Sequence, residues 1–131
     1  PLLDAKGQVL RMDLQPVQVS GDEFALGLLV RNLVENASRY APAGATVDVR
    51  TWQLEDRACL SVEDSGPGIP EDERERVFDR FYRRLGSRHE GSGLGLAIVR
   101  EVVAAHMGTI RLAQSPQWGG LSVQVELPRL A

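Results

Sequence analysis

The chain has 131 residues, of which 43% are apolar and 25% are charged, values typical of a single soluble domain with an ordinary hydrophobic core. Its formal net charge of −3 argues against a broadly basic surface, and therefore against nucleic acid or an anionic membrane as a partner. The only cysteine, Cys59, excludes an internal disulfide and a cysteine metal cluster, and it favours a reducing compartment.

The predicted elements begin with an alternating apolar segment. The first twenty residues predict a bent strand or two short strands, interrupted at Pro16. A helix is expected over residues 22–40, with Ser20 and Glu23 as a capping box at its start. An Ala-Pro-Ala-Gly turn ends this helix.

The middle of the chain predicts a β-hairpin, a turn and a short helix. The strands are expected over residues 47–51 and 58–62, with their connection at residues 55–57. A turn-rich break over residues 64–70 comes next, and a short charged helix over residues 71–78 follows it.

The last third predicts a loop, a helix and two strands. Residues 83–95 are rich in glycine and are expected to form a mobile loop. A second long helix over residues 94–106 is expected to end at Gly108, a C-cap glycine. Strands over residues 109–113 and 121–127 complete the chain. This order predicts an α+β domain with a layer of helices on one sheet.

The sequence is also expected to be part of a longer protein, because it begins at Pro1 and not at a methionine. No apolar run approaches the roughly 18 residues that a transmembrane helix needs, and no signal peptide is recognisable. We therefore expect one domain over residues 1–131 that makes no direct membrane contact.

The helix over residues 22–40 has two distinct faces. At about 100° per residue, one narrow sector holds the predicted core positions Leu26, Val30, Leu33 and Ala37. A second sector, roughly 60° wide, holds Asn32, Asn36 and Arg39, with Tyr40 at its edge.

The two asparagines, one turn apart, indicate a ligand site on this second face. A solvated polar face is the ordinary alternative, but Glu or Lys would be the favourable choice there, because asparagine is a poor helix former. A carboxamide oxygen suits a hard cation such as Mg²⁺ and, unlike a carboxylate, does not repel adjacent phosphates. Arg39 would then meet a phosphate oxygen.

Residues 64–69, Asp-Ser-Gly-Pro-Gly-Ile, form the second candidate site, although alone they would be interpreted as an ordinary loop after a strand. Gly66 and Gly68 would let the backbone approach a flat ligand closely. Asp64 follows an apolar strand and would accept a hydrogen bond from the exocyclic amine of adenine. Guanine carries an oxygen at that position, so such an aspartate would select adenine.

The third candidate is the glycine-rich segment 91–96, Gly-Ser-Gly-Leu-Gly-Leu, at the start of the second long helix. Backbone amides at a helix N-terminus are a natural phosphate site. The segment is neither a Walker A loop nor a dinucleotide fingerprint, since the lysine motif and the preceding strand are missing. Upstream, Phe78 and Phe81 are expected to anchor a loop, and one or two of the arginines near them to reach a triphosphate.

In this order, the three segments and the phenylalanine stretch resemble the N, G1, F and G2 boxes of the sensor histidine kinase ATP-binding domain. Gyrase B, heat-shock chaperone ATPases and mismatch-repair ATPases share this superfamily. The resemblance covers residues 17–128. It implies a Bergerat-type two-layer α/β sandwich, with three helices on one face of a mixed, roughly five-stranded sheet and a flexible lid over ATP.

The resemblance also implies roles for single residues. It places Mg²⁺ on Asn36 with Asn32 nearby, a phosphate contact on Arg39 and an adenine-facing ring on Tyr40. Asp64 matches the aspartate that reads adenine.

Further positions match the pocket floor and the lid. Arg83 matches a lid arginine near the γ-phosphate, so the implied catalytic residues are Asn32, Asn36, Arg39 and Arg83. The remaining nucleotide-binding positions are Gly66, Gly68, Ile69, Phe81, Gly91, Ser92, Gly93, Leu94, Gly95 and Leu96.

Asn32 separates this chain from the hydrolytic relatives. Those ATPases carry a glutamate one turn before the metal-binding asparagine, where it acts as general base on water. An amide cannot accept that proton, so efficient hydrolysis is not expected. We expect phosphoryl transfer to an acceptor outside this chain, with catalysis by positioning and charge stabilisation.

The phosphoacceptor itself is missing, because neither His89 nor His106 resembles the family's acceptor box. The domain is therefore not expected to autophosphorylate alone, and His106 is expected to be structural. Two departures from the family are a short lid between residues 81 and 91, and Leu121 where a Thr or Ser often follows the hairpin glycine.

The expected function is that of the catalytic domain of a bacterial two-component sensor kinase, which binds Mg·ATP and phosphorylates a histidine. The implied partners are its own dimerisation and phosphoacceptor domain and a cognate response regulator, with no nucleic acid. The parent is expected to be a homodimeric inner-membrane sensor with this domain in the cytoplasm, and the fragment a monomer. The alternatives are an anti-sigma-type serine kinase and a nucleotide-binding regulatory module without transfer activity.

Overall fold

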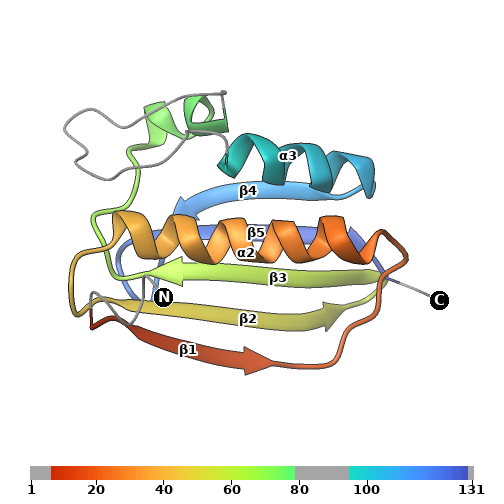
Figure 1. Cartoon of the computed structure of the whole chain (residues 1–131), viewed down its shortest axis with the longest axis horizontal. Coiled ribbons are helices and arrows are strands. Elements are labelled where there is room, and N and C mark those ends of the chain that lie inside the picture. The colour runs from red at the N-terminus through yellow and green to blue at the C-terminus, as the bar shows by residue number, and fades with distance from the viewer. Residues whose placement is uncertain (1–6, 79–94, 130–131) are drawn as a thin grey trace.

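The computed structural model describes residues 7–78 and 95–129, which form a five-stranded sheet with helices on one face (Figure 1). In chain order the elements are β1 (Val9–Leu14), α2 (Glu23–Tyr40), β2 (Thr46–Leu54), β3 (Arg57–Asp64), the 3-10 turns η1 (Glu71–Glu73) and η2 (Arg76–Phe78), α3 (Gly95–Ala105), β4 (Thr109–Gln114) and β5 (Leu121–Pro128). Within the two described ranges, no helix combines the length and apolar character needed to cross a membrane.

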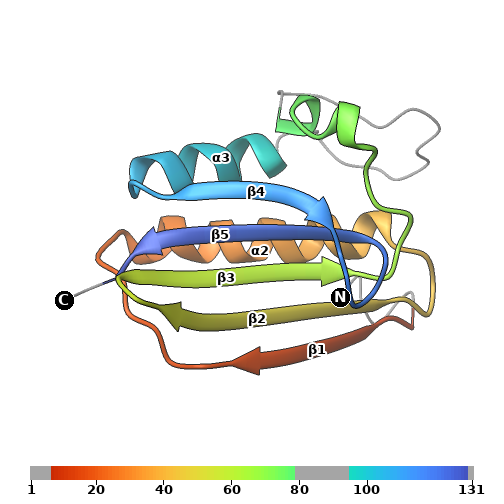
Figure 2. The ribbon, with the colours of Figure 1, turned by 180° about the vertical axis from the view of Figure 1, so that it is seen from behind.

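The sheet has the strand order β1-β2-β3-β5-β4. β1 runs parallel to β2, whereas every other neighbouring pair is antiparallel, so the sheet is mixed. Helices α2 and α3 lie over one face, and the view from behind in Figure 2 shows that the other face carries no helix in the described part of the chain. The predicted fold class is confirmed.

The core lies between the sheet and the two helices. Along β5 every second residue is apolar and at most 8% exposed, namely Leu121, Val123, Val125 and Leu127. These side chains belong to one buried cluster with Leu29 and Leu33 of α2 and Val99 and Val103 of α3. The period of two in the strand and of 3.6 in the helices brings both apolar sets to the same interface.

The start of α2 differs from the prediction. Asp22, and not Ser20, caps the helix, because its carboxylate accepts hydrogen bonds from the backbone N–H groups of Phe24 and Ala25 at 2.9 and 3.4 Å. The N-cap position thus lies two residues later than the predicted capping box.

The core stripe of α2 also differs by one position. Val30 was predicted to be in the core but is 40% exposed, whereas Leu29 is 2% exposed. The helix is rotated so that Leu29, Leu33 and Ala37, four residues apart, pack on the sheet. Local periodicity predicts such a stripe only to within one residue, and packing against the sheet decides which residues are buried.

The end of α3 differs as well. The residue with left-handed backbone is Met107, with a φ of 60°, and not Gly108. The N–H of Gly108 donates to the carbonyl oxygen of Val103 at 2.9 Å, as in a Schellman motif. A Cβ on Gly108 would lie 2.5 Å from the backbone oxygen of Glu126, so glycine is required there by the close approach of β5.

Two other segments also differ from the prediction. The first apolar segment forms the single edge strand β1, which ends before Pro16. Residues 71–78 form η1 and η2 and not one continuous helix. The predicted hairpin and the last two strands are confirmed, with somewhat longer strands.

Candidate functional site

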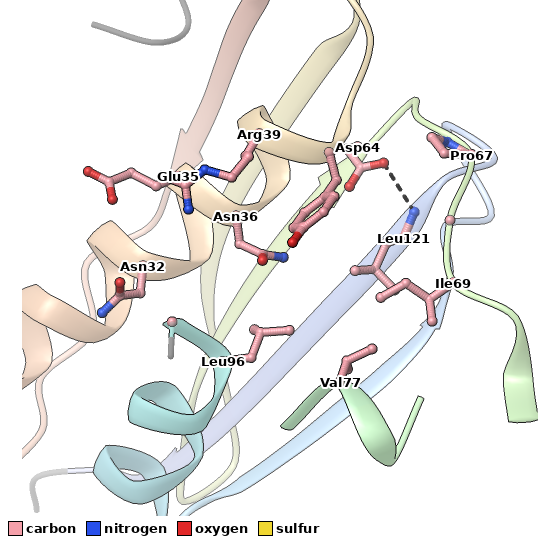
Figure 3. A pocket seen from close by; sticks show the side chains of 13 residues that line it. Asn32, Glu35, Asn36, Arg39, Asp64, Pro67, Ile69, Val77, Leu96 and Leu121 are labelled. Carbon is pink, nitrogen blue, oxygen red and sulfur yellow. Dashed lines mark hydrogen bonds between the residues drawn. The ribbon is translucent and has the colours of Figure 1, made fainter. Parts of the chain in front are cut away.

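A pocket opens between α2, the start of α3 and the loop that follows β3 (Figure 3). It is lined by Asn32, Glu35, Asn36, Arg39, Tyr40, Asp64, Pro67, Gly68, Ile69, Val77, Gly95, Leu96 and Leu121. The antiparallel pairing of β3 with β5 places the end of one strand beside the start of the other, so segments far apart in sequence meet here.

Most of the predicted site residues that the structure describes line this pocket. They are Asn32, Asn36, Arg39, Tyr40, Asp64, Gly68, Ile69, Gly95 and Leu96. Gly66 does not line it; its N–H donates to Asp64 Oδ1 at 2.9 Å and so orients that carboxylate. Six predicted residues lie outside the described ranges: Phe81, Arg83, Gly91, Ser92, Gly93 and Leu94.

The polar wall of the pocket is one face of α2. Spacings of four and three residues place Asn32, Asn36 and Arg39 on the same side of the helix, as Figure 3 shows. The start of α3 lies against this wall, since a Cβ built on Gly95 would be 3.6 Å from Asn32 Oδ1. The Asn32 carboxamide therefore lies beside a helix start, where backbone N–H groups carry partial positive charge, and Asn36 and Arg39 continue the same wall.

A buried glutamine holds the end of α2 next to the pocket. The Gln8 carboxamide donates to the carbonyl oxygens of Ser38, Ala41 and Pro42 at 3.0, 3.0 and 3.1 Å, and it accepts a hydrogen bond from the Ser38 hydroxyl. Carbonyl groups at a helix C-terminus lack donors from a following turn, and this side chain supplies them.

Asp64 is the buried acid of the pocket and is 5% exposed at the end of β3. Its Oδ1 accepts hydrogen bonds from the N–H groups of Gly66 and Leu121 at 2.9 and 3.2 Å, the second of which is drawn in Figure 3. Its backbone oxygen accepts from the N–H of Gly120 at 3.1 Å. The two bonds to Oδ1 orient the carboxylate, and the third holds the backbone of the same residue.

An apolar wall, with residues from η2, α3, β5 and the loop after β3, completes the pocket. Ile69, Val77, Leu96 and Leu121 are each at most 8% exposed. An apolar slot with one fixed acid suits a planar ring that carries an amine, whereas the polar wall suits a chain of phosphates with a cation.

Four lining residues were not predicted from the sequence: Glu35, Pro67, Val77 and Leu121. Helical spacing would have found Glu35, which lies three residues after Asn32 and also pairs with Arg31 at 3.0 Å. Pro67 stands between two predicted glycines. Val77 and Leu121 carry no local signal, because only the packing of η2 and the pairing of β5 bring them to the pocket.

His106 lies at the far end of α3 from the pocket. Its Nδ1 donates to the carbonyl oxygen of Val102 at 2.8 Å, and its Nε2 accepts from the N–H of Asp22 at 3.2 Å. The ring thus joins the end of α3 to the start of α2, in agreement with the structural role predicted for it.

A protein-family model described as histidine kinase-, DNA gyrase B-, and HSP90-like ATPase matches residues 21–131. The chain belongs to this family. This ATPase domain is 44% identical over 121 residues to the sensor protein kinase PmrB of Pseudomonas aeruginosa, a match that spans 92% of the chain and 25% of PmrB.

Solved structures agree with this assignment. The ATPase domain resembles the mycobacterial sensor histidine kinase MprB with a TM-score of 0.88 and 38% identity, over 98% of this chain and 88% of that chain. It resembles full-length ShkA, in complex with AMPPNP, with a TM-score of 0.82 and 27% identity, over 100% of this chain and 27% of ShkA. The domain is therefore of the histidine kinase catalytic type, and it spans about a quarter of the length of its curated relatives.

Proposed function

We propose that this domain binds ATP together with Mg²⁺ and donates the γ-phosphate to a histidine on the dimerisation helices of a parent sensor kinase. The observation that carries the proposal is one pocket with Asn32 at one end, the buried Asp64 at the other and Asn36 between them (Figure 3). A nucleotide has the same two ends, a polyanionic chain and a planar base. The sensor-kinase relatives and the AMPPNP complex of ShkA support it.

The donor set of α2 fits Mg²⁺ that is shared with a phosphate chain. Asn36, with Asn32 one turn earlier, offers hard oxygen atoms without negative charge. Among the described residues, no group of three or more His, Cys, Asp or Glu side chains could hold a metal ion. We therefore expect the cation to enter with the triphosphate, whose negative charge it neutralises when bound.

The residues of the pocket bind and orient the nucleotide. Asp64 accepts a hydrogen bond from the amine of adenine, Tyr40 lies beside the ring, and Arg39 contacts a phosphate. Asn32 cannot accept a proton from water, so we expect slow ATP hydrolysis by the domain alone. Of the residues outside the described ranges, Arg83 is proposed to act near the γ-phosphate.

The activity of the whole protein is proposed from the same family. The γ-phosphate would pass to the dimerisation and phosphoacceptor domain, and from there to a cognate response regulator. The parent would be a homodimeric inner-membrane sensor that holds this domain in the cytoplasm.

The first test is calorimetric titration of the 131-residue chain with ATP and GTP, each with and without Mg²⁺. We expect ATP-selective binding in the wild type, loss of this selectivity in Asp64→Asn, and loss of the Mg²⁺ dependence in Asn36→Ala. Asp56→Asn, in the exposed turn between β2 and β3, is the control and should bind as the wild type does. No binding, or equal binding of GTP, would contradict the proposal.

A second test follows the phosphate. The domain is mixed with the parent's dimerisation domain and ATP labelled at the γ-phosphate. We expect label that survives alkali and is lost in acid, as phosphohistidine is. Acid-stable label would indicate a serine kinase, and binding without label would indicate a regulatory module.

A further inference from the structure

The turn between β4 and β5 is anchored on the sheet face opposite the pocket. Nε1 of Trp118 donates to Oδ2 of Asp48 at 2.9 Å, and Asp48, on β2, is 3% exposed. Arg50 pairs with the same carboxylate at 3.1 Å, and the Arg11 guanidinium of β1 lies 5.5 Å from the centroid of the Trp118 ring. The turn is thus held by β1 and β2, although neither β4 nor β5 pairs with them.

The other end of the same turn holds Asp64. Leu121 donates to its Oδ1, and Gly120 donates to its backbone oxygen. A Cβ on Gly120 would lie 2.3 Å from each of these two oxygen atoms. The turn and the carboxylate therefore fit together with no room to shift independently.

Hydrogen bonds inside the turn connect its two ends. The N–H of Ser115 donates to Gly120 O at 2.7 Å, and the N–H of Gly119 donates to Ser115 O at 2.9 Å. The Ser115 hydroxyl accepts from the N–H of Trp118 at 3.0 Å and donates to Glu63, the neighbour of Asp64. A displacement of Trp118 would therefore reach Gly120 and would not be absorbed within the turn.

We infer that Trp118 is a positioning residue for Asp64 and, through it, sets the selectivity for adenine. This role rests on the proposed function, in which Asp64 accepts a hydrogen bond from the adenine amine. Trp118 does not line the pocket, so its effect must pass through the turn. A hydrogen bond to a base weakens steeply when the acceptor is misplaced, so an anchor on the far face can control it.

The test compares Trp118→Phe, which removes the indole donor but keeps a ring beside Arg11, with Trp52→Phe as matched control. Trp52 lies on β2, at the opposite end of that strand from the turn. The titrated ligands are ATP and ITP, which differ at the six position, where ITP carries an oxygen in place of the amine. We expect Trp118→Phe to lose about tenfold in ATP affinity, the size expected of one hydrogen bond to a charged group, and little in ITP affinity.

Two further measurements separate positioning from general stability. Without nucleotide, the amide NMR signals of Gly66, Gly120 and Leu121 should shift in Trp118→Phe and not in Trp52→Phe. Asp48→Asn keeps an oxygen acceptor for the indole, so it should retain more of the ATP preference than Asp48→Leu.

The outcomes distinguish this role from the proposed function. A folded Trp118→Phe that binds ATP and ITP in the wild-type ratio, or that loses both equally, would overturn the positioning role. A wild-type chain that binds ATP and ITP equally would instead contradict the function proposed for Asp64, and the role of Trp118 would fall with it.

Discussion

At the scale of single residues, the floor of the pocket depends on a glycine. A Cβ on Gly120 would lie 2.3 Å from two oxygen atoms of Asp64 and 2.7 Å from the backbone nitrogen of Gly66. A Cβ added to Gly27, in the second turn of α2, would have no such atom within 4 Å. Replacement of glycine by alanine should therefore have opposite effects on the free energy of unfolding at these two positions.

We predict that Gly120→Ala lowers the free energy of unfolding by about 2 kcal/mol, because the turn or Asp64 must move, and that it also weakens ATP binding. Gly27→Ala should raise the free energy of unfolding by up to about 1 kcal/mol, since alanine favours an exposed helix. Urea unfolding followed by circular dichroism measures both. A neutral Gly120→Ala would show that the close contact at Asp64 is not required.

At the scale of elements, α2 is held at both ends by side chains from other segments. Asp22 caps its first turn and His106 joins that start to the end of α3. Gln8, from the segment before β1, bonds three carbonyl oxygens at its last turn. Both ends of α2, the helix that carries the polar wall of the pocket, are therefore held in place.

We predict that Gln8→Leu lowers the free energy of unfolding by about 2 kcal/mol, because buried carbonyl groups lose their donor. ATP affinity should fall as well, since the end of α2 beside Arg39 is then less well fixed. Gln53→Leu is the matched control on an exposed position of β2 and should change stability by no more than about 0.5 kcal/mol. Thermal unfolding measures the stability, and calorimetry measures the ATP affinity. A Gln8→Leu variant with the stability and affinity of the wild type would argue against the role of these hydrogen bonds.

At the scale of the whole molecule, the buried carboxylate of Asp48 joins β2 to the turn between β4 and β5, two strands that do not pair with β2. Burial by itself raises the pKa of Asp48. This effect is outweighed by hydrogen bonds from Trp118 and Arg50 and by the positive charges of Arg50 and Arg11, so the pKa lies below its ordinary value of 3.8. The folded state therefore favours the charged form, in which Asp48 holds β1, β2 and the β4–β5 turn together.

The lowered pKa of Asp48 makes the stability of the fold depend on pH. A carboxyl group whose pKa is lower in the folded than in the unfolded state stabilises the fold at pH values above its unfolded-state pKa. This stabilisation is lost as the pH falls through the folded-state pKa. We predict that the wild type is more stable than Asp48→Asn near neutral pH, and that this difference shrinks at pH values below 3.8. Urea unfolding at a series of pH values measures it, and a difference that grows in acid would contradict the assigned pairing.

Sequence patterns were sufficient for much of the fold and for one wall of the site. The helix over residues 22–40 and the strand pairs follow from local periodicity and turn residues, which do not depend on distant contacts. The spacing of Asn32, Asn36 and Arg39 placed them on one face for the same reason. These features were recognisable because each is encoded within a few helical turns or one hairpin.

Tertiary structure alone decided the features that depend on distant segments. Whether Leu29 or Val30 enters the core depends on how α2 is rotated against the sheet, and a difference of one position is small on the helix surface. Leu121 reaches the pocket only through the pairing of β5 with β3. The sequence by itself therefore determined which elements form and which polar face α2 presents. Only the folded sheet decided how Asp64 is held beyond its local bond to Gly66, because its partners Gly120 and Leu121 and their anchor at Trp118 come from a hairpin more than fifty residues away.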